Sequence, residues 1–284
     1  WIYPMTWQAA LALGGALSMS STAIVTKILS DRMELETEQG RNVIGILLFQ
    51  DLAVVFLLIL IPSLAQSGKD LVVDIAFALV KISLALVLIF YIGQNIMSRW
   101  FKFVAGYRSQ ELFMLNLLLI VLGMSALTEH FGLSMALGAF LAGMLISETP
   151  YRHEVEDDIK PFRDVLLGLF FITIGMLLDP IVIYEQWFLV LLLFILPLVF
   201  KFGLIAILTR GFGASPGISI RTGLCLAQAG EFGFVLLTQI DGLHLVDPAF
   251  SQAVLAAMLL SMLVAPFLIQ YSDQIALRFA GNEW

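Results

Sequence analysis

Long apolar runs, separated by short polar connections, dominate this chain. Runs such as LLLIVLGMSALT and FLVLLLFILPLVF lack the strict alternation, in segments of about ten residues, of a transmembrane barrel. A spanning helix needs about 20 mostly apolar residues. The pattern therefore predicts an all-α polytopic membrane protein with about nine transmembrane helices. These are expected at residues 7–29, 41–61, 72–95, 111–129, 132–147, 164–183, 187–209, 219–240 and 249–271.

Composition supports this class and excludes others. Of the 284 residues, 60% are hydrophobic and only 13% are charged, with a mean hydropathy of +0.96. A soluble domain has about 45–50% apolar and about 25% charged residues, so a disordered chain and an ordinary soluble enzyme are excluded. The net charge of −7 argues against nucleic acid. Cys225 is the single cysteine, so no disulfide framework or zinc cluster is expected.

Basic residues set the predicted orientation, because cytoplasmic loops of membrane proteins are enriched in Lys and Arg. Nine spans place all but one of the loop residues of this kind on the same side, with Lys69 alone opposite. That side is therefore expected to be cytoplasmic, with the C-terminus on it. Its basic residues are Arg32, Arg41, Arg99, Lys102, Arg108, Arg152, Lys160, Arg163, Arg210, Arg221 and Arg278. The chain begins at Trp1 rather than Met and has no visible signal peptide, so we expect a fragment.

Four spans carry polar residues at a similar depth. Asp51 and Glu231 each lie about 15 Å, and Lys201 about 13 Å, along a helix from the nearest basic residue at the cytoplasmic side. Ser20, Ser21 and Thr22 lie at a comparable depth. Ionisable groups in the hydrocarbon are costly and mark functional sites, so this layer predicts an ion site near the midplane.

Each of these residues also has a structural interpretation. Asp51 and Lys201 could form a purely structural ion pair, and Glu231 could simply stabilise a broken helix. The hydroxyls at residues 20–22 could bond back to their own helix, as Ser and Thr inside helices often do.

Two spans are predicted to be interrupted. The segments LGGALSMSSTA and CLAQAGEFGF mix glycine with hydroxyl, amide or carboxyl groups inside apolar runs. Glycine costs about 1 kcal/mol relative to alanine in a helix interior, which favours unwound backbone lining a cavity. Paired broken helices are the best sequence indication of a transporter ion site, since half-helix ends offer carbonyls to a cation and positive dipoles to a carboxylate.

Four stretches carry a family resemblance that spans nearly the whole chain: ALSMSSTAIVTKIL, GRNVIGILLFQDLAVV, LSMALGAFLAGMLISETPYRHEVEDDIKPFRDVLLGLFFITIGMLLD and LAQAGEFGFVLL. With them the chain resembles the Kef-type potassium/proton antiporters of the monovalent cation:proton antiporter-2 family. The resemblance implies an inverted-repeat, sodium/proton-antiporter-like fold of thirteen helices, whose two broken helices cross at the midplane. This chain would hold the last nine. Residues 1–64 and 187–284 would form the transport core, 71–97 a linker helix, and 110–184 the dimerising scaffold.

The resemblance also assigns roles to particular residues. Asp51 takes the position of the family's cation- and proton-binding carboxylate, and Gln50 stands where sodium-like relatives carry a second aspartate. Lys201 matches the basic residue that pairs with the carboxylate. The segment RHEVEDDIKPF resembles an acidic cytoplasmic loop used in regulation, although a solvated charged loop is the alternative. Its candidate regulatory residues are His153, Glu154, Glu156, Asp157 and Asp158.

These inferences predict exchange of a monovalent cation for a proton, by competition at Asp51. Potassium follows from the resemblance, and a sodium/proton antiporter is the alternative. The hydroxyls of Ser21 and Thr22, with freed backbone carbonyls, would replace water around the ion, and Gln50 would contribute a carbonyl oxygen without charge. Gln228 and Glu231 would support the second broken helix. A single carboxylate favours electroneutral exchange. We expect a homodimer in a bacterial inner membrane, a regulatory domain or subunit outside this chain, no cofactor and no nucleic-acid partner.

Other functions remain open at this point. A ligand-gated potassium efflux channel on the same scaffold would conduct without proton counterflow, but the chain has no filter motif such as TVGYG. An intramembrane enzyme is disfavoured, because HExxH is absent and the adjacent pair Asp157 and Asp158 lies outside the apolar runs. The fragment alone could also be inactive.

Overall fold

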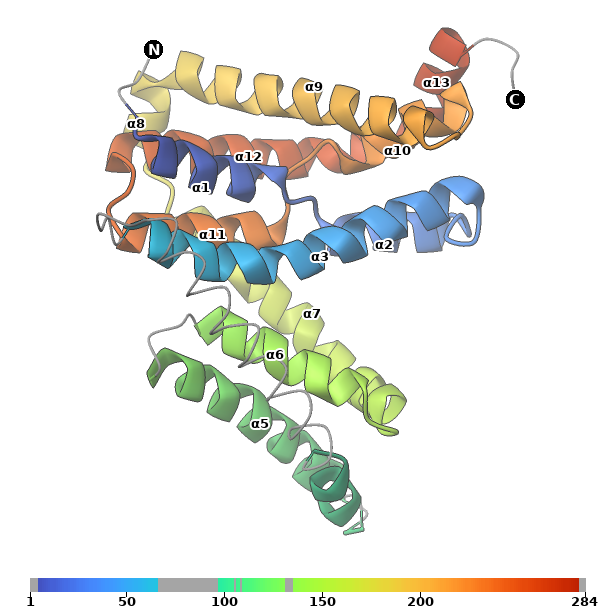
Figure 1. The fold of residues 1–284 in the computed structure, drawn as a ribbon, viewed down its shortest axis with the longest axis vertical. Helices are drawn as coiled ribbons and strands as arrows, with labels where there is room; N and C mark the ends of the chain where they lie inside the picture. The colour runs from blue at the N-terminus through green and yellow to red at the C-terminus, as the bar shows by residue number, and fades with distance from the viewer. Residues whose placement is uncertain (1–4, 66–96, 105, 108, 131–134, 281–284) are drawn as a thin grey trace. The chain divides into compact units, whose positions relative to one another are not determined.

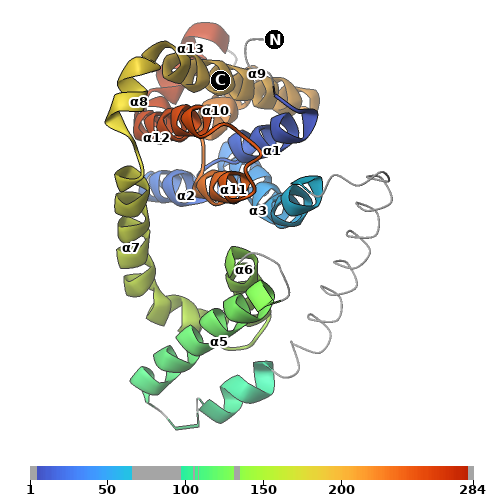
Figure 2. The same cartoon turned by 90° about the vertical axis from the view of Figure 1, so that its left-hand side faces the viewer.

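The computed structural model describes residues 5–65, 97–104, 106–107, 109–130 and 135–280. Within these ranges the regular secondary structure is helical throughout (Figures 1 and 2). The chain divides into two compact units. Unit 1 takes residues 1–57 and 177–284, and unit 2 takes residues 58–176.

Unit 1 holds the interrupted helices. Its elements are α1 (Trp7–Ser18), α2 (Thr22–Asp31), most of α3 (Glu38–Ala65), α8 (Pro180–Glu185), α9 (Trp187–Gly211), α10 (Pro216–Leu226), α11 (Glu231–Gly242), α12 (Pro248–Gln270) and α13 (Ser272–Ala280). Local sequence sets several of these starts. Asp179, Ser215 and Asp247 each cap the first backbone N–H groups of a helix whose next residue is proline, a preferred pairing because proline lacks an N–H there.

The core of unit 1 brings distant segments together. α1 packs against α11, and α10 packs against α9 (Figure 1). Buried side chains from α2, α3, α9, α10 and α12 form one hydrophobic cluster: Val25, Leu29, Val43, Leu47, Ile205, Cys225, Leu226 and Ile269. Burial of these side chains fixes the half-helices α2 and α10 against continuous helices.

Unit 2 contains α5 (Gln110–His130), α6 (Met135–Ser147) and α7 (Arg152–Met176), together with helical residues 97–104. Phe101, Phe113 and Leu117 belong to its buried cluster. The indole Nε1 of Trp100 donates to Asn116 Oδ1 at 2.6 Å, which satisfies a polar group on an apolar helix.

Of the nine expected spans, the described residues provide five helices that are long and apolar enough to cross a membrane, or six if α10 and α11 count as one bent span. α6 has 13 residues, fewer than a crossing needs. The expected span 72–95 lies outside the described residues. Large exposed side chains on α9, including Phe200 at 66% and Ile207 at 72%, fit a surface that faces lipid.

The sequence interpretation of the sixth span was wrong at both ends. The span was expected at 164–183, but α7 runs from Arg152 to Met176 and α8 starts anew at Pro180. The acidic segment with His153 and Asp158 is therefore the first part of a helix rather than a loop. Helix propensity explains the error, because Glu, Lys and Arg favour helix as strongly as many apolar residues do.

Candidate ion-binding site

Both interruptions predicted from the sequence are present. α1 ends at Ser18 and α2 begins at Thr22, while α10 ends at Leu226 and α11 begins at Glu231. The second pair of half-helices bends by 45° at its break. Four half-helix ends therefore lie at residues whose backbone groups lack partners within their own helices.

The two breaks contact each other directly. A Cβ atom on Gly230 would collide with the carbonyl carbon and oxygen of Ser20 and lie 2.9 Å from the nitrogen of Ser21. The hydroxyl of Ser20 donates to the carbonyl of Leu226 at 2.8 Å. The side chain of one break thus satisfies a helix-end carbonyl of the other, and glycine permits the close approach.

Lys201 of α9 joins the two breaks. Its Nζ donates to the carbonyls of Met19 at 2.8 Å and Gln228 at 2.7 Å, and to the hydroxyl of Ser20 at 3.1 Å. The residue is only 7% exposed. All three ammonium protons are therefore used on the oxygens of the two breaks, where an alkali ion would otherwise find carbonyl ligands.

Asp51 of α3 faces the start of α2. Both of its carboxylate oxygens accept from the hydroxyl of Thr22, at 3.2 Å each. The N-terminus of α2 favours negative charge because its N–H groups carry a partial positive charge. Among the described residues no ion pair joins Asp51 and Lys201. The pairing implied by the family resemblance is therefore not the contact made here.

Gln50 was expected to offer its side-chain oxygen to the cation, but both ends of its carboxamide bond the backbone of the first break. Its Oε1 accepts from the backbone N–H of Ser20 at 3.2 Å, and its Nε2 donates to the carbonyl of Ser18 at 3.0 Å. Ser21 is the N-cap of α2, and its hydroxyl accepts from the N–H of Ile24. Both side chains therefore hold the shape of the break.

Glu231 and Gln228 lie on the second break. Glu231 Oε1 accepts from the backbone N–H of Ala23 at 3.3 Å, which links α11 to the first turn of α2. Gln228 is fully buried, and within the described part of the chain neither end of its carboxamide has a hydrogen-bond partner. Its carbonyl, in contrast, is bound by Lys201. Both residues thus support the crossing through different groups.

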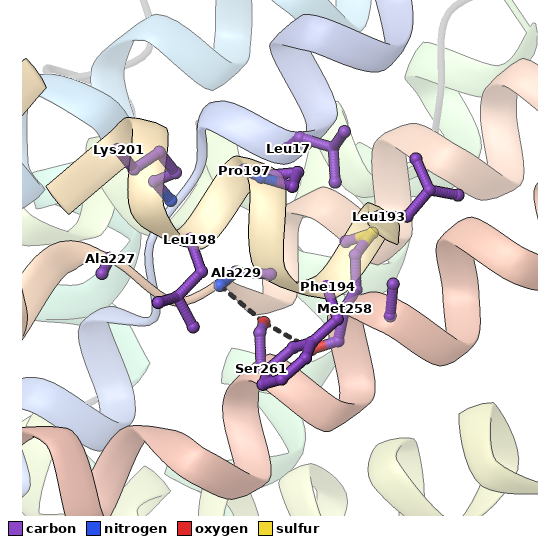
Figure 3. A pocket seen from close by; sticks show the side chains of 11 residues that line it. Leu17, Leu193, Phe194, Pro197, Leu198, Lys201, Ala227, Ala229, Met258 and Ser261 are labelled. Carbon is purple, nitrogen blue, oxygen red and sulfur yellow. Dashed lines mark hydrogen bonds between the residues drawn. The ribbon is translucent and has the colours of Figure 1, made fainter. Parts of the chain in front are cut away.

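Ser261 of α12 is a site residue that sequence reasoning missed. Its Oγ accepts from the N–H of Ala229 at 3.0 Å and donates to the carbonyl of Met258 (Figure 3). Ser261 and Ala229 line a cavity of about 10 Å³, which Lys201 also lines. This is roughly the space that one water molecule needs. A serine in the middle of an apolar stretch of α12 was the available sequence signal.

Lys201→Met should destabilise the protein, because it leaves the carbonyls of Met19 and Gln228 buried without their donor. Each such group costs about 1–3 kcal/mol, so we expect a loss of about 2–6 kcal/mol in unfolding free energy. Thermal unfolding in detergent measures it. Lys27→Met is the matched control, since the Lys27 side chain is 74% exposed and pairs with Asp31 one turn along the same helix. Equal stability of the two variants would contradict the bridging role.

The site residues named from the sequence thus fall into two groups. Ser21, Thr22, Gln50, Asp51, Lys201, Gln228 and Glu231 all belong to the crossing in unit 1 or contact it. The five acidic-segment residues at positions 153–158 lie on α7 in unit 2, where Asp158 accepts from Gln110 at 2.8 Å. Nothing in these contacts links that segment to the ion site.

Crossed broken helices beside an intramembrane carboxylate are typical of secondary transporters. Comparison with known proteins makes this more specific. Residues 1–271 match the family described as sodium/hydrogen exchanger, transmembrane, and the chain belongs to this family.

Individual relatives of this chain are named as potassium-efflux proteins. The chain is 40% identical over 285 residues to a putative K(+) efflux antiporter KefB of Alkalimonas amylolytica, covering 100% of the chain and 43% of the relative. It is 39% identical over 278 residues to the chloroplastic K(+) efflux antiporter 1 of Arabidopsis thaliana, covering 95% of the chain and 23% of the relative. A glutathione-regulated potassium-efflux system protein KefC of Enterobacter is 37% identical over 267 residues, with 93% and 43% covered. The predicted Kef-type resemblance is confirmed, and the chain spans less than half the length of these relatives.

Proposed function

We propose that this chain is the membrane part of an antiporter that exchanges a monovalent cation, with potassium preferred, for a proton. One observation carries the proposal: Asp51 lies against the N-terminal end of α2, next to the crossing of two broken helices. Membership of the sodium/hydrogen exchanger family and the names of the potassium-efflux relatives support the choice of ions.

The cation is expected to bind at Asp51 and Thr22. Three of the carbonyls nearest the breaks already accept from protein donors: Met19 and Gln228 from Lys201, and Leu226 from Ser20. The oxygens that remain for a dehydrated alkali ion are the two of the Asp51 carboxylate and the hydroxyl of Thr22, with Ser21 beside them. A carboxylate that holds a proton has lost the charge that attracts the cation, so the two ions compete.

Electroneutral exchange is the expected stoichiometry. Gln50 contributes no charge, and Lys201 is held by three protein oxygens in the crossing. Only Asp51 then changes its charge during a cycle, so one cation leaves for each proton that binds. A lysine that released its own proton in the cycle would make the exchange electrogenic.

Alternating access would come from movement of the transport core, proposed as residues 1–64 and 187–284, against the scaffold at 110–184. The expected linker at 71–97 falls almost wholly outside the described residues. We further propose that the scaffold carries a homodimer interface, that the protein lies in a bacterial inner membrane, and that the side with Arg32 and Arg221 faces the cytoplasm. A regulatory domain or subunit would act from that side.

Proton flux in proteoliposomes tests the function. The full-length protein that carries this chain is reconstituted with a pH gradient and a pH-sensitive dye, and potassium or sodium is added. We expect potassium to dissipate the gradient at a lower concentration than sodium, without net current across the membrane. A current without proton movement would indicate a channel, and a preference for sodium would indicate a sodium/proton antiporter.

A further inference from the structure

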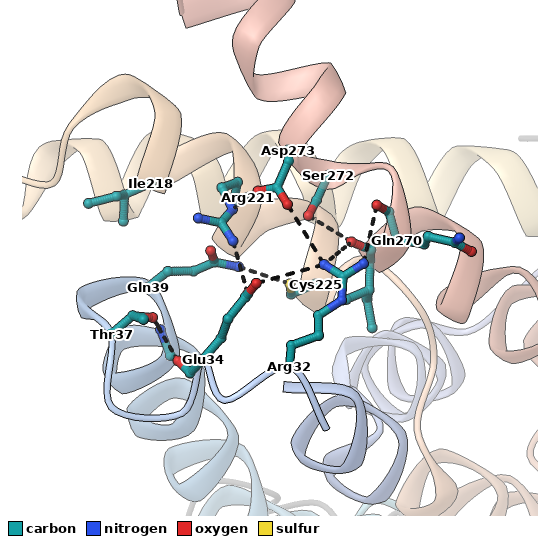
Figure 4. Close-up of polar contacts among 12 residues, drawn as sticks. Arg32, Glu34, Thr37, Gln39, Ile218, Arg221, Cys225, Gln270, Ser272 and Asp273 are labelled. Atoms are coloured by element: carbon teal, nitrogen blue, oxygen red, sulfur yellow. Dashed lines mark hydrogen bonds and ion pairs between the residues drawn. The ribbon is translucent and has the colours of Figure 1, made fainter. Parts of the chain in front are cut away.

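Four charged residues of unit 1 form a closed ring, which we call the four-charge ring: Arg32, Glu34, Arg221 and Asp273 (Figure 4). Arg221 lies 2.9 Å from Glu34 and 2.7 Å from Asp273. Arg32 lies 3.9 Å from Glu34 and 3.8 Å from Asp273. Each arginine thus meets both carboxylates, and the charges cancel.

The ring is better protected from water than an ordinary surface ion pair. The side chain of Arg221 is 12% exposed and that of Glu34 is 22% exposed, whereas those of Lys27 and Asp31 are 74% and 60% exposed. Exposed pairs contribute little because water and salt screen them. A shared, partly buried network of four groups is coupled more strongly.

The ring joins the two half-helices α2 and α10 to the end of α12 and the start of α13. Arg32 is the C-cap of α2 and also donates to the carbonyls of Ile269 and Gln270 at the end of α12. Arg221 lies on α10, five residues before its last residue, and Asp273 lies in the first turn of α13. Since α2 is unbroken between Arg32 and Thr22, and α10 is unbroken between Arg221 and the second break, a shift at the ring should be carried along both half-helices to the crossing.

Asp273 is the member of the ring that can be released most easily. Its side chain is 43% exposed, the largest exposure of the four. Its loss leaves Arg221 paired with Glu34, but it removes the ion pairs that join α13 to the two arginines. The ring therefore has one stable pair and one detachable carboxylate, which sits on a separate helix.

We infer that Arg221 and Asp273 are positioning residues that hold α2 and α10 in the geometry that the ion site requires, and that α13 alters cation affinity through Asp273. This inference rests on the proposed function, which it extends to control of the same site. Neither residue touches the ion. Both act through the two half-helices: α2 begins at Thr22, which bonds Asp51, and α10 ends at Leu226, whose carbonyl accepts from Ser20 in the first break.

Asp273→Asn in the full-length protein tests the inference, with Asp31→Asn as the matched control. We expect Asp273→Asn to keep exchange but to raise the half-saturating potassium concentration by about threefold or more, as the coupling of charged neighbours predicts. Asp273→Glu should restore the value, and Asp31→Asn should leave it unchanged. A merely structural role would lower the amount of folded protein without this selective change.

Cys225 provides a readout that does not need transport. It is the single cysteine of the chain, is fully buried, and lies one helical turn beyond Arg221, where Gln39 Nε2 donates to its sulfur at 3.3 Å. Alkylation by N-ethylmaleimide, followed on the Cys225 peptide by mass spectrometry, should be faster in Asp273→Asn than in the parent and in Asp31→Asn.

A double-mutant cycle completes the test. Glu34→Gln and Asp273→Asn remove carboxylates that share both arginines, so their effects on potassium affinity should be non-additive. Additive effects, or an unchanged half-saturating concentration in Asp273→Asn, would overturn the inference. If the parent protein does not exchange a cation for protons, the proposed function is wrong. Unchanged labelling of Cys225 in Asp273→Asn would separately show that the ring does not position α10.

Discussion

Asp51→Asn is expected to reduce cation-driven proton flux to that of protein-free liposomes. Asparagine has nearly the same shape, and its Oδ1 can still accept from the hydroxyl of Thr22, which bonds the carboxylate at 3.2 Å. The variant should therefore fold, but it can neither carry the charge that attracts an alkali ion nor take up and release a proton. Dye-reported flux in proteoliposomes measures the loss.

Binding can be measured separately from transport in the same variant. A ligand that binds only the folded protein stabilises it by about 2.7 kcal/mol at one hundred times its dissociation constant. Potassium should raise the thermal stability of the parent and of Asp31→Asn, whose side chain is 60% exposed in an ion pair with Lys27. It should not stabilise Asp51→Asn. Exchange at the parental rate in that variant would refute the assignment of Asp51.

The continuous helices were predictable because hydrophobicity alone specifies them. The expected spans 41–61 and 187–209 lie within the apolar helices α3 and α9, and the span 249–271 matches α12 to within one residue at each end. The breaks were predictable for a related reason: glycine and hydroxyl residues inside such runs weaken the helix and offer other partners to its backbone. Both observed breaks, at residues 19–21 and 227–230, fall inside the segments singled out.

Partners of the polar residues were harder to predict. The distance along each helix placed Asp51 and Lys201 in one layer, but it did not show toward which neighbouring helix each side chain points. Lys201 therefore had two candidate partners, the carboxylate and the freed carbonyls, and it bonds the carbonyls. The four-charge ring was not foreseen either, because three of its four pairs join residues far apart in the sequence and no local pattern records that proximity.

Gly230→Ala is expected to break the crossing while leaving every polar group of the site in the chain. Gly230 has φ −127° and ψ 167°, a conformation open to any residue, so the backbone itself would not be strained. The obstacle is contact, since the added Cβ would collide with the backbone of Ser20. Backbone on both sides cannot yield as a flexible side chain does, so the two breaks must separate.

The cost of that separation should be large. Overpacking typically costs about 1–3 kcal/mol, and here it also stretches the bonds from Ser20 to Leu226 and from Lys201 to both breaks. We expect thermal unfolding in detergent to show a loss at the upper end of that range or beyond, and exchange to fall with it.

Gly14→Ala is the control for the same chemical change. Gly14 lies inside α1, and a Cβ there would meet nothing within 4 Å. Alanine in a helix interior is favoured over glycine by about 0.5–1 kcal/mol, so this variant should be slightly more stable and fully active. If Gly230→Ala were as stable and as active in exchange as Gly14→Ala, the two breaks would not need their close contact. The contact between the breaks would then not be what positions the residues of the ion site.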